Sequence, residues 1–254
     1  MNLLDISSPG ILGLGFVLLF FILMLVYAAI SRRRPARNLR PIPAFAHLGR
    51  AIGLAVEAGE RLHLSLGRGT LEGLQGGSAI IGLVMLQRIA RATSISDRPP
   101  VATSGEGSLT ILSQDTLHSA YRNIGALEQY SPLSGQFTGA TPFSYAAGTL
   151  PVIYDQQVSA NVLAGHFGSE VALITDAAER SGSMTLAGSD SLPAQAIMYA
   201  TAQEPLIGEE LYAGGAYLQA GPLHVASLHV EDIFRWLLVI FILAGAALKL
   251  VGAL

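Results

Sequence analysis

The segment 103–108, with the sequence TSGEGS, is the first candidate for chemistry in this chain. It lies between a predicted strand and a predicted helix. Its backbone N–H groups and the hydroxyls of Ser104 and Ser108 could therefore surround an anion at a helix N-terminus. Glu106 in the middle repels a phosphate and could instead serve as a carboxylate at the helix entry. The alternative is a tight turn in which serine caps the helix.

A second candidate group lies around the start of an earlier predicted strand, and consists of Glu57, Glu60, Arg61 and His63. Two carboxylates three residues apart beside a strand can form an acid–base pair. The alternative is a solvated helix end in which a glutamate pairs with the arginine. If the ends of the strands form a ligand crevice, Glu57 and His63 are expected near it.

A third candidate is the predicted helix 207–218, whose sequence is IGEELYAGGAYL. Its small, flat surface with aromatic edges is made by Tyr212, Gly214, Gly215 and Tyr217. Glycine inside a helix costs about 1 kcal/mol relative to alanine, so close packing against a neighbour is expected to offset that cost. The neighbour is either the sheet of the same chain or another subunit.

Familiar catalytic and cofactor motifs are absent from the sequence. It has no G-x-S-x-G and no H-E-x-x-H, and the single lysine, Lys249, does not belong to a phosphate-binding loop. The glycine pair of Gly67-Arg68-Gly69 is not completed, because Glu72 stands where a dinucleotide fingerprint has its third glycine. The six histidines show no spacing of three or four residues. We predict no cofactor and no metal, and we favour a non-catalytic protein while leaving an enzyme open.

Two apolar segments are long enough to cross a bilayer. Residues 11–30 contain no charge, and at about 1.5 Å per residue they span about 30 Å. The segment is followed by Arg32, Arg33, Arg34, Arg37 and Arg40. Positive charge after rather than before the apolar run predicts an uncleaved anchor, with the N-terminus outside and the arginines in the cytoplasm.

The second predicted span is 236–254, with Trp236 at its cytoplasmic interface and Lys249 close enough to the end to reach the far one. The alternative is a buried core helix. A third apolar stretch, 74–87, is short for a span and is assigned to the soluble core, with a re-entrant membrane segment as the alternative. Both termini are therefore expected outside the cell membrane, with the main domain in the cytoplasm.

The charge distribution excludes nucleic acid as a partner. Charged residues are 13% of the chain, and cysteine is absent. Residues 51–231 hold seven arginines and sixteen acidic residues, a net charge of −9, which opposes binding to a phosphate backbone. The expected partners are the lipid bilayer and further copies of the chain, with subunits of a larger membrane complex as an additional possibility.

Alternating predicted strands and helices indicate an α/β fold with a largely parallel, Rossmann-like sheet. Strands are predicted at 61–67, 101–104, 143–147, 158–164 and 184–187, and helices at 43–58, 70–92, 109–124, 169–181, 191–201 and 205–219. Residues 126–142 are predicted as a loop between two lobes, 41–125 and 143–220. The predicted domains are an anchor at 1–30, a cytoplasmic body at 31–231 and a second transmembrane helix at 232–254.

Four segments, in order, resemble an uncharacterised prokaryotic membrane-anchored family that is classed as a domain of unknown function. They are IPAFAHLGRAIGLAVEAGERLHLSLG, SDRPPVATSGEGS, VSANVLAGHFGSEVALITDAAERSG and GSDSLPAQAIMYATAQEPLIGEELYAGGAYL. The resemblance covers about residues 37–220. It implies a single architecture beside a membrane, and it implies no activity, cofactor or catalytic residue.

Three functional hypotheses follow. The first is a homo-oligomeric scaffold on the cytoplasmic face, because the body is tied down at both ends, has low charge and lacks a catalytic constellation. The second is a membrane-tethered enzyme or small-ligand sensor that uses a crevice at the strand ends, lined by Ser104, Glu106 and Ser108. The third is an accessory subunit of a larger membrane complex.

Overall fold

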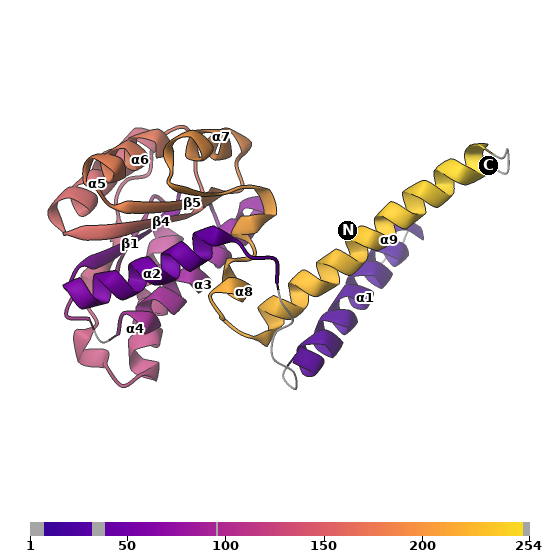
Figure 1. Cartoon of the computed structure of the whole chain (residues 1–254), viewed down its shortest axis with the longest axis horizontal. Coiled ribbons are helices and arrows are strands. Elements are labelled where there is room, and N and C mark those ends of the chain that lie inside the picture. The colour runs from indigo at the N-terminus through magenta and orange to yellow at the C-terminus, as the bar shows by residue number, and fades with distance from the viewer. Residues whose placement is uncertain (1–7, 32–38, 95, 251–254) are drawn as a thin grey trace, which may run out of the picture. The chain divides into compact units, whose positions relative to one another are not determined.

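The computed structural model describes residues 8–31, 39–94 and 96–250. The chain divides into two compact units (Figure 1). The helical unit holds α1 (Ser8–Ser31) and α9 (Pro222–Leu250). The α/β unit is the segment Pro41–Ala220.

The α/β unit is built on one parallel sheet. Its strands are β1 (Arg61–Gly67), β2 (Val101–Ser104), β3 (Gly135–Phe137), β4 (Val158–His166), β5 (Met184–Ser189) and β6 (Glu204–Leu206). The strand order is β3-β2-β1-β4-β5-β6, and every pair is parallel. The predicted α/β fold class is confirmed, and the order is that of doubly wound dinucleotide-binding folds.

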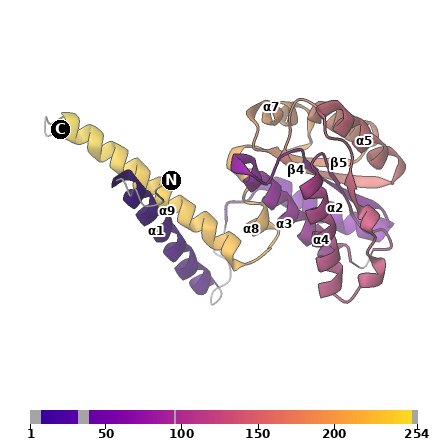
Figure 2. The same cartoon turned by 180° about the vertical axis from the view of Figure 1, so that it is seen from behind.

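Helices cover both faces of this sheet. They are α2 (Pro43–Ala58), α3 (Gly76–Ala92), α4 (Gly107–Asn123), α5 (Pro142–Asp155), α6 (Val171–Arg180), α7 (Leu192–Thr201) and the short α8 (Gly214–Tyr217). Figure 1 and the view from behind in Figure 2 show α2, α3 and α4 on one face and α5, α6 and α7 on the other. This arrangement encloses one apolar core on each side of the sheet.

Side chains alternate along β1 between the two faces of the sheet, apolar on one face and polar on the other. Leu62, Leu64 and Leu66 lie in the core with α2, α3 and α4. His63 and Ser65 alternate with the leucines, and so face α5, where Ser65 bonds the Tyr145 hydroxyl. One face is therefore an ordinary leucine core, while the other buries polar side chains.

Several predicted elements are wrong. Residues 143–147 begin α5 rather than forming a strand, because Thr141 and Ser144 make a capping box and Pro142 suits the first helical turn. The two expected lobes, 41–125 and 143–220, are not separate, since β1 pairs with β4 in one continuous sheet. The predicted loop 126–142 contains the edge strand β3.

Two predicted helices are shorter than expected. The helix predicted at 70–92 begins at Gly76, and the Thr70 hydroxyl donates to the Glu72 carbonyl in the loop that precedes it. The helix predicted at 205–219 is divided into β6, a 3-10 turn at Gly208–Leu211 and α8. Glycine and proline favour such breaks over one continuous helix.

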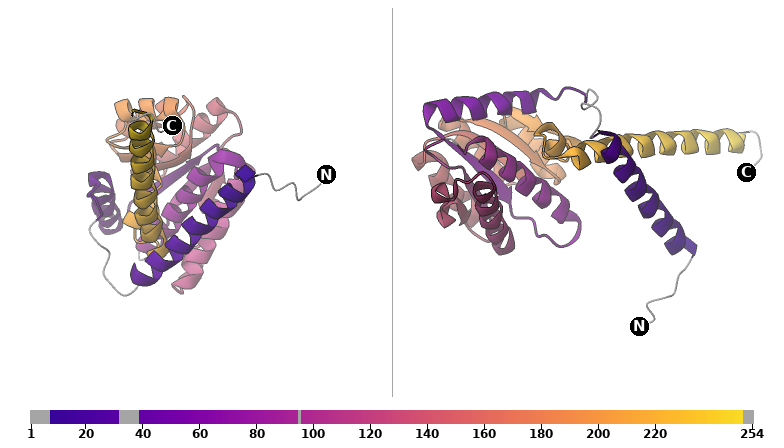
Figure 3. Two further views of the ribbon diagram at one scale, coloured as in Figure 1. Left: turned by 90° about the vertical axis from the view of Figure 1, so that its right-hand side faces the viewer. Right: turned by 90° about the horizontal axis from the view of Figure 1, so that it is seen from below.

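In the described part of the chain, α1 and α9 are the two helices long and apolar enough to span a membrane. Figure 3 shows that the two helices lie at an angle to each other. Helix α9 starts before the predicted boundary at residue 232, because Pro222 suits a first turn and neither glycine nor proline follows until Gly245. Of the arginines predicted to set the topology, Arg40 is described and exposed, and the other four, at 32, 33, 34 and 37, lie outside the described residues.

Gly82 sets the distance between α3 and the sheet. A Cβ atom built there comes within 2.4 Å of the Ala164 carbonyl oxygen of β4. We expect Gly82→Ala to destabilise the α/β unit by about 1–3 kcal/mol, since a rigid strand must move. Gly49 in α2 has no atom within 4 Å of the same position, so Gly49→Ala should be neutral or stabilise by up to about 1 kcal/mol. The melting temperature of the full chain in mild detergent should fall for Gly82→Ala and be unchanged or rise for Gly49→Ala, and equal shifts would contradict this packing.

Candidate functional site

The candidate site lies where the carboxyl ends of β1 and β4 adjoin. Gly67 of β1 pairs with His166 of β4, and from these neighbouring strands the sheet continues in opposite directions to β3 and β6. Open α/β sheets bind ligands outside the carboxyl ends of the strands at such a point of divergence. We call the side chains gathered here the switch-point site, and define it as Arg68, His166, Glu170 and Asp190.

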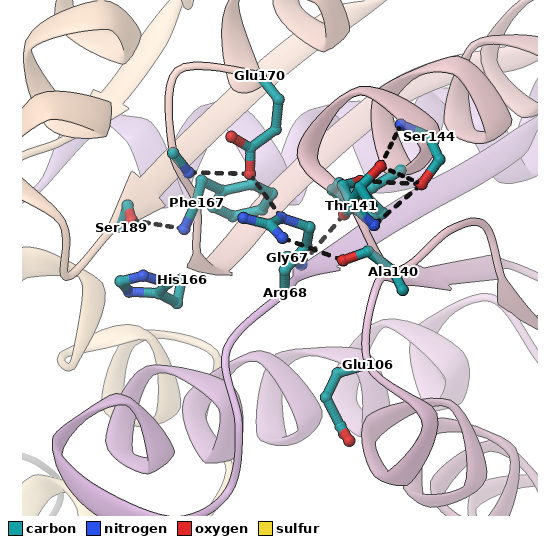
Figure 4. Close-up of polar contacts among 12 residues, drawn as sticks. Gly67, Arg68, Glu106, Ala140, Thr141, Ser144, His166, Phe167, Glu170 and Ser189 are labelled. Atoms are coloured by element: carbon teal, nitrogen blue, oxygen red, sulfur yellow. Dashed lines mark hydrogen bonds and ion pairs between the residues drawn. The ribbon is translucent and has the colours of Figure 1, made fainter.

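Arg68 and Glu170 form the first pair of the site (Figure 4). Arg68 Nε donates to Glu170 Oε1 at 3.1 Å, and Nη1 donates to the Ala140 carbonyl at 3.1 Å. The backbone N–H of Gly168 donates to the same Glu170 oxygen at 3.0 Å. The Glu170 side chain is 1% exposed and that of Arg68 is 25% exposed, so a buried carboxylate holds a partly accessible guanidinium.

Hydrogen bonds keep Glu170 ionised in spite of its burial. Burial alone raises the pKa of this carboxyl group. The hydrogen bonds from the backbone of Gly168 and of Glu170 itself, together with Arg68, outweigh that effect and lower the pKa below its ordinary value. Glu170 is therefore a fixed negative charge and not a candidate proton donor.

His166 and Asp190 form the second pair. His166 Nδ1 lies 2.7 Å from Asp190 Oδ1, and the Ser78 hydroxyl lies 3.0 Å from Asp190 Oδ2. Since an ionised carboxylate only accepts hydrogen bonds, Nδ1 carries the proton and Nε2 of the neutral ring is an acceptor. His166 is 28% exposed and Asp190 is 14% exposed. Asp190, itself held by Ser78, thus orients the ring, which remains partly open to solvent.

Glycines allow the two strand ends to approach. Gly67 has φ +71°, and a Cβ atom there meets the His166 carbonyl oxygen at 2.2 Å. A Cβ atom on Gly69 lies 2.7 Å from His166 Cβ. Both positions therefore require glycine, and the glycines first noted as part of an incomplete nucleotide fingerprint serve to bring Arg68 beside His166.

The TSGEGS segment closes upon itself. Glu106 caps α4 by accepting from the Leu109 N–H at 2.8 Å and from the Ser108 hydroxyl, as its predicted place at the helix entry requires. The Ser104 hydroxyl donates to the Glu106 carbonyl at 2.9 Å. Burial raises the pKa of Glu106, but bonds from Ser108 and the first-turn N–H groups lower it overall. These groups form a tight turn whose polar atoms contact one another, but Glu106 caps the helix in it rather than the serine of the alternative interpretation.

Glu57 and His63 do not come together. Glu57 is exposed on α2, whereas His63 is fully buried on the other side of β1. His63 Nδ1 lies 2.8 Å from Asn161 Oδ1, and Nε2 lies 2.8 Å from Thr103 Oγ1. Burial lowers the pKa of His63 to about 4, against a smaller raising effect of the Asn161 bond. His63 is thus a neutral member of a buried polar network.

Most of the predicted small-residue surface packs within the chain. Gly214 and Gly215 are buried, and a Cβ on Gly214 lies 3.0 Å from Met85 Sδ. The Tyr217 ring stacks on Phe45 with centroids 5.0 Å apart. Tyr212 is 40% exposed. Only Tyr212, among these four, keeps enough surface to serve the predicted contact with another subunit.

Sequence patterns did not reveal the switch-point site. Arg68 and Glu170 are 102 residues apart, and Ser78 and Asp190 are 112 apart, so no local motif contains either pair. The signal that could have found the site is the position of its residues at the carboxyl ends of strands. Arg68 follows β1, His166 ends β4 and Asp190 follows β5. Polar residues directly after the strands of a parallel sheet gather at one edge.

A dinucleotide, which this strand order implies, does not fit the residues present. Its pyrophosphate requires a short glycine turn and a free helix N-terminus after β1. Here residues 68–75 separate β1 from α3, and Asp190 contacts Ser78 in the first turn of α3. A carboxylate already occupies the position of the phosphate charge. Among residues 8–31, 39–94 and 96–250, no three histidine, cysteine or acidic side chains are grouped to hold a metal ion.

Comparison with known proteins identifies the family but not the activity. No match was found among curated proteins or among solved structures. A family model matches residues 10–254, nearly the whole chain, and so includes both apolar helices as well as the α/β unit. The chain therefore belongs to the family described as Domain of unknown function (DUF6754).

Proposed function

We propose that this protein is a membrane-anchored α/β module that binds a small polar ligand at the switch-point site. The observation that carries the proposal is the pair of partly exposed basic side chains, Arg68 and His166, that adjoining strand ends bring together and carboxylates hold in place. Ligands of open α/β sheets bind at this position. The two apolar helices support the anchor.

The two side chains suit a ligand that carries both acceptors and donors. The guanidinium of Arg68 has five N–H groups, more than its contacts with Glu170 and Ala140 use. His166 offers Nε2 as an acceptor, and protonation would turn it into a donor. A small carboxylic acid, sugar or amino acid meets these requirements better than a nucleotide does, because Asp190 repels a phosphate at α3.

The proposed topology places the α/β unit in the cytoplasm and both chain termini outside the cell membrane. Five arginines between residues 32 and 40 follow the first apolar helix, and positive flanking charge is retained on the cytoplasmic side. In this arrangement the switch-point site samples cytoplasmic metabolites.

A ligand screen by thermal shift tests the binding proposal. The full chain in mild detergent is melted with separate sets of carboxylates, sugars, amino acids and nucleotides. We expect one of the first three sets to raise the melting temperature, and His166→Gln to abolish that increase. His118→Gln is the control, because His118 packs on Tyr130, outside the switch-point site. A shift that persists in His166→Gln, or no shift from any set, argues against the site.

A homo-oligomeric scaffold is the second candidate, and exposed apolar side chains favour it. Each lies in the segment that follows a strand of the same parallel sheet. They are Ile80, Ile111, Phe143, Leu192 and Tyr212, which are 40–77% exposed. Apolar groups gathered at one edge are typical of surfaces that bind another protein.

Replacing Tyr212 by glutamate tests this assembly. We expect Tyr212→Glu to reduce the particle mass measured by light scattering in mild detergent, because a charge enters the contact. Tyr199→Glu is the matched control, since Tyr199 is 72% exposed on the far part of α7. An unchanged mass removes Tyr212 from any interface. Copurification of unrelated chains would instead favour the accessory-subunit hypothesis.

A further inference from the structure

The ring contacts of the helical unit fix the register between its two helices. The Phe234 ring of α9 lies 4.6 Å from Phe16 and 5.7 Å from Phe20 of α1. Further along, His229 of α9 lies 6.0 Å from Tyr27. Increasing residue numbers in α1 therefore meet decreasing numbers in α9, so the helices run antiparallel. Phe234 is level with the middle of α1 rather than with its end.

This register staggers the apolar segments. The apolar window of α1 is Gly13–Ile30, about 27 Å at 1.5 Å per residue, close to the thickness of a bilayer core. In α9 the uncharged segment begins only at Trp236. This is two residues after Phe234, the residue that contacts Phe16 and Phe20 of α1. A membrane that covers α1 therefore also covers the part of α9 that precedes Trp236.

That part of α9 carries a group of charges, which we call the charged triplet and define as Glu231, Asp232 and Arg235. Arg235 contacts the carboxylates of Glu231 at 3.6 Å and of Asp232 at 3.7 Å. Along α9, Glu231 and Asp232 lie between His229, which contacts Tyr27, and Phe234, which contacts Phe16. Arg235 directly follows Phe234. Its depth is thus that of the apolar centre of α1.

The charged triplet is largely exposed in the helical unit. Its side chains are 49%, 64% and 49% exposed in the order Glu231, Asp232 and Arg235. Charged groups are costly in the hydrocarbon region of a membrane, and they usually face other protein.

We propose that a second copy of this chain covers the charged triplet within the membrane. The triplet is self-complementary, since a twofold arrangement sets Arg235 of each copy beside the carboxylates of the other. Polar contacts between helices then replace contacts of charge with lipid. This inference rests on the membrane anchor proposed above, and is independent of the switch-point site.

Cross-linking in native membranes tests the inference, and the chain is suited to it because it has no cysteine. Val239 is four residues after Arg235 and so lies on the same helix face, whereas Ile240 lies on a different, exposed face. We expect Val239→Cys to give a dimer with a short bis-maleimide and Ile240→Cys to remain monomeric. The neutral background E231Q/D232N/R235Q should reduce the yield about tenfold, the factor for about 1–2 kcal/mol of polar helix contact.

The outcomes separate the inference from the anchor. Dimers of Val239→Cys that depend on the triplet support the contact. If neither variant gives a dimer, or both give equal amounts, while carbonate washing leaves the chain in the membrane, the contact is overturned and the anchor stands. If carbonate removes the chain, both are overturned.

Discussion

Replacing Arg68 by methionine should destabilise the α/β unit by about 3 kcal/mol, the lower end of the range for breaking a buried ion pair. The reason is that Glu170, only 1% exposed, is left charged without its cation. The lower end applies because Arg68 itself is 25% exposed. Hydrogen exchange of the β1 and β4 amides in the full chain measures this change as faster opening.

Arg180→Met is the matched control for this experiment. Arg180 pairs with Asp176 at 2.8 Å, but both side chains are more than half exposed, so losing this pair should change stability far less than losing Arg68. The double variant Arg68→Met/Glu170→Gln should recover part of the stability, because no charge remains buried. If Arg68→Met lowers the stability no more than Arg180→Met does, then the pair of Arg68 and Glu170 does not hold the strand ends together.

Acid should destabilise the α/β unit through His63. Its pKa is about 4 in the fold and 6.5 ordinarily, so the unfolded chain takes up the proton first as pH falls. Stability from the neutral ring is complete above pH 6.5 and is lost between pH 6.5 and 4. The total loss is about 3 kcal/mol, with about 2 kcal/mol already lost at pH 5. Hydrogen exchange at pH 7.5 and 5, corrected for intrinsic rates, measures it.

His63→Gln separates this effect from other titrations. Glutamine can bond Asn161 and Thr103 and takes up no proton, so its pH dependence should be about 2 kcal/mol weaker over the same interval. His118→Gln is the control for replacing a histidine elsewhere, because His118 lies half-buried on α4, outside the network of His63. If the stability of His63→Gln depends on pH as strongly as that of the wild type, another group is responsible for the loss in acid.

Local sequence patterns predicted the centre of the fold well and its edges poorly. The bounds of α2, β1 and β2 agree with the structure, because glycine and proline mark the ends of these strongly patterned segments. The edge strands β3 and β6 have three residues each and no alternation long enough to detect. Residues 143–147 alternate like a strand, yet the Thr141 cap and Pro142 start a helix there.

The candidate site was less accessible to prediction than the fold. Glu106 was predicted as a carboxylate at a helix entry, a local role, and the structure places it there. His166, Asp190 and Arg68 depend on strand order, which brings β4 between β1 and β5. Local periodicity does not determine strand order. Glu57 and His63, both expected near a crevice at the strand ends, lie apart, since Glu57 faces solvent on α2 and His63 is buried in the sheet.

Histidine side-chain nitrogen NMR of the full chain, with a ligand from the thermal-shift screen, examines the switch-point site itself. Binding should move the Nε2 resonance of His166, assigned by its loss in His166→Gln. The resonances of the buried His63 should remain unchanged in the same spectrum. If the ligand saturates the protein and His166 does not respond, then the switch-point site is not where this protein binds it.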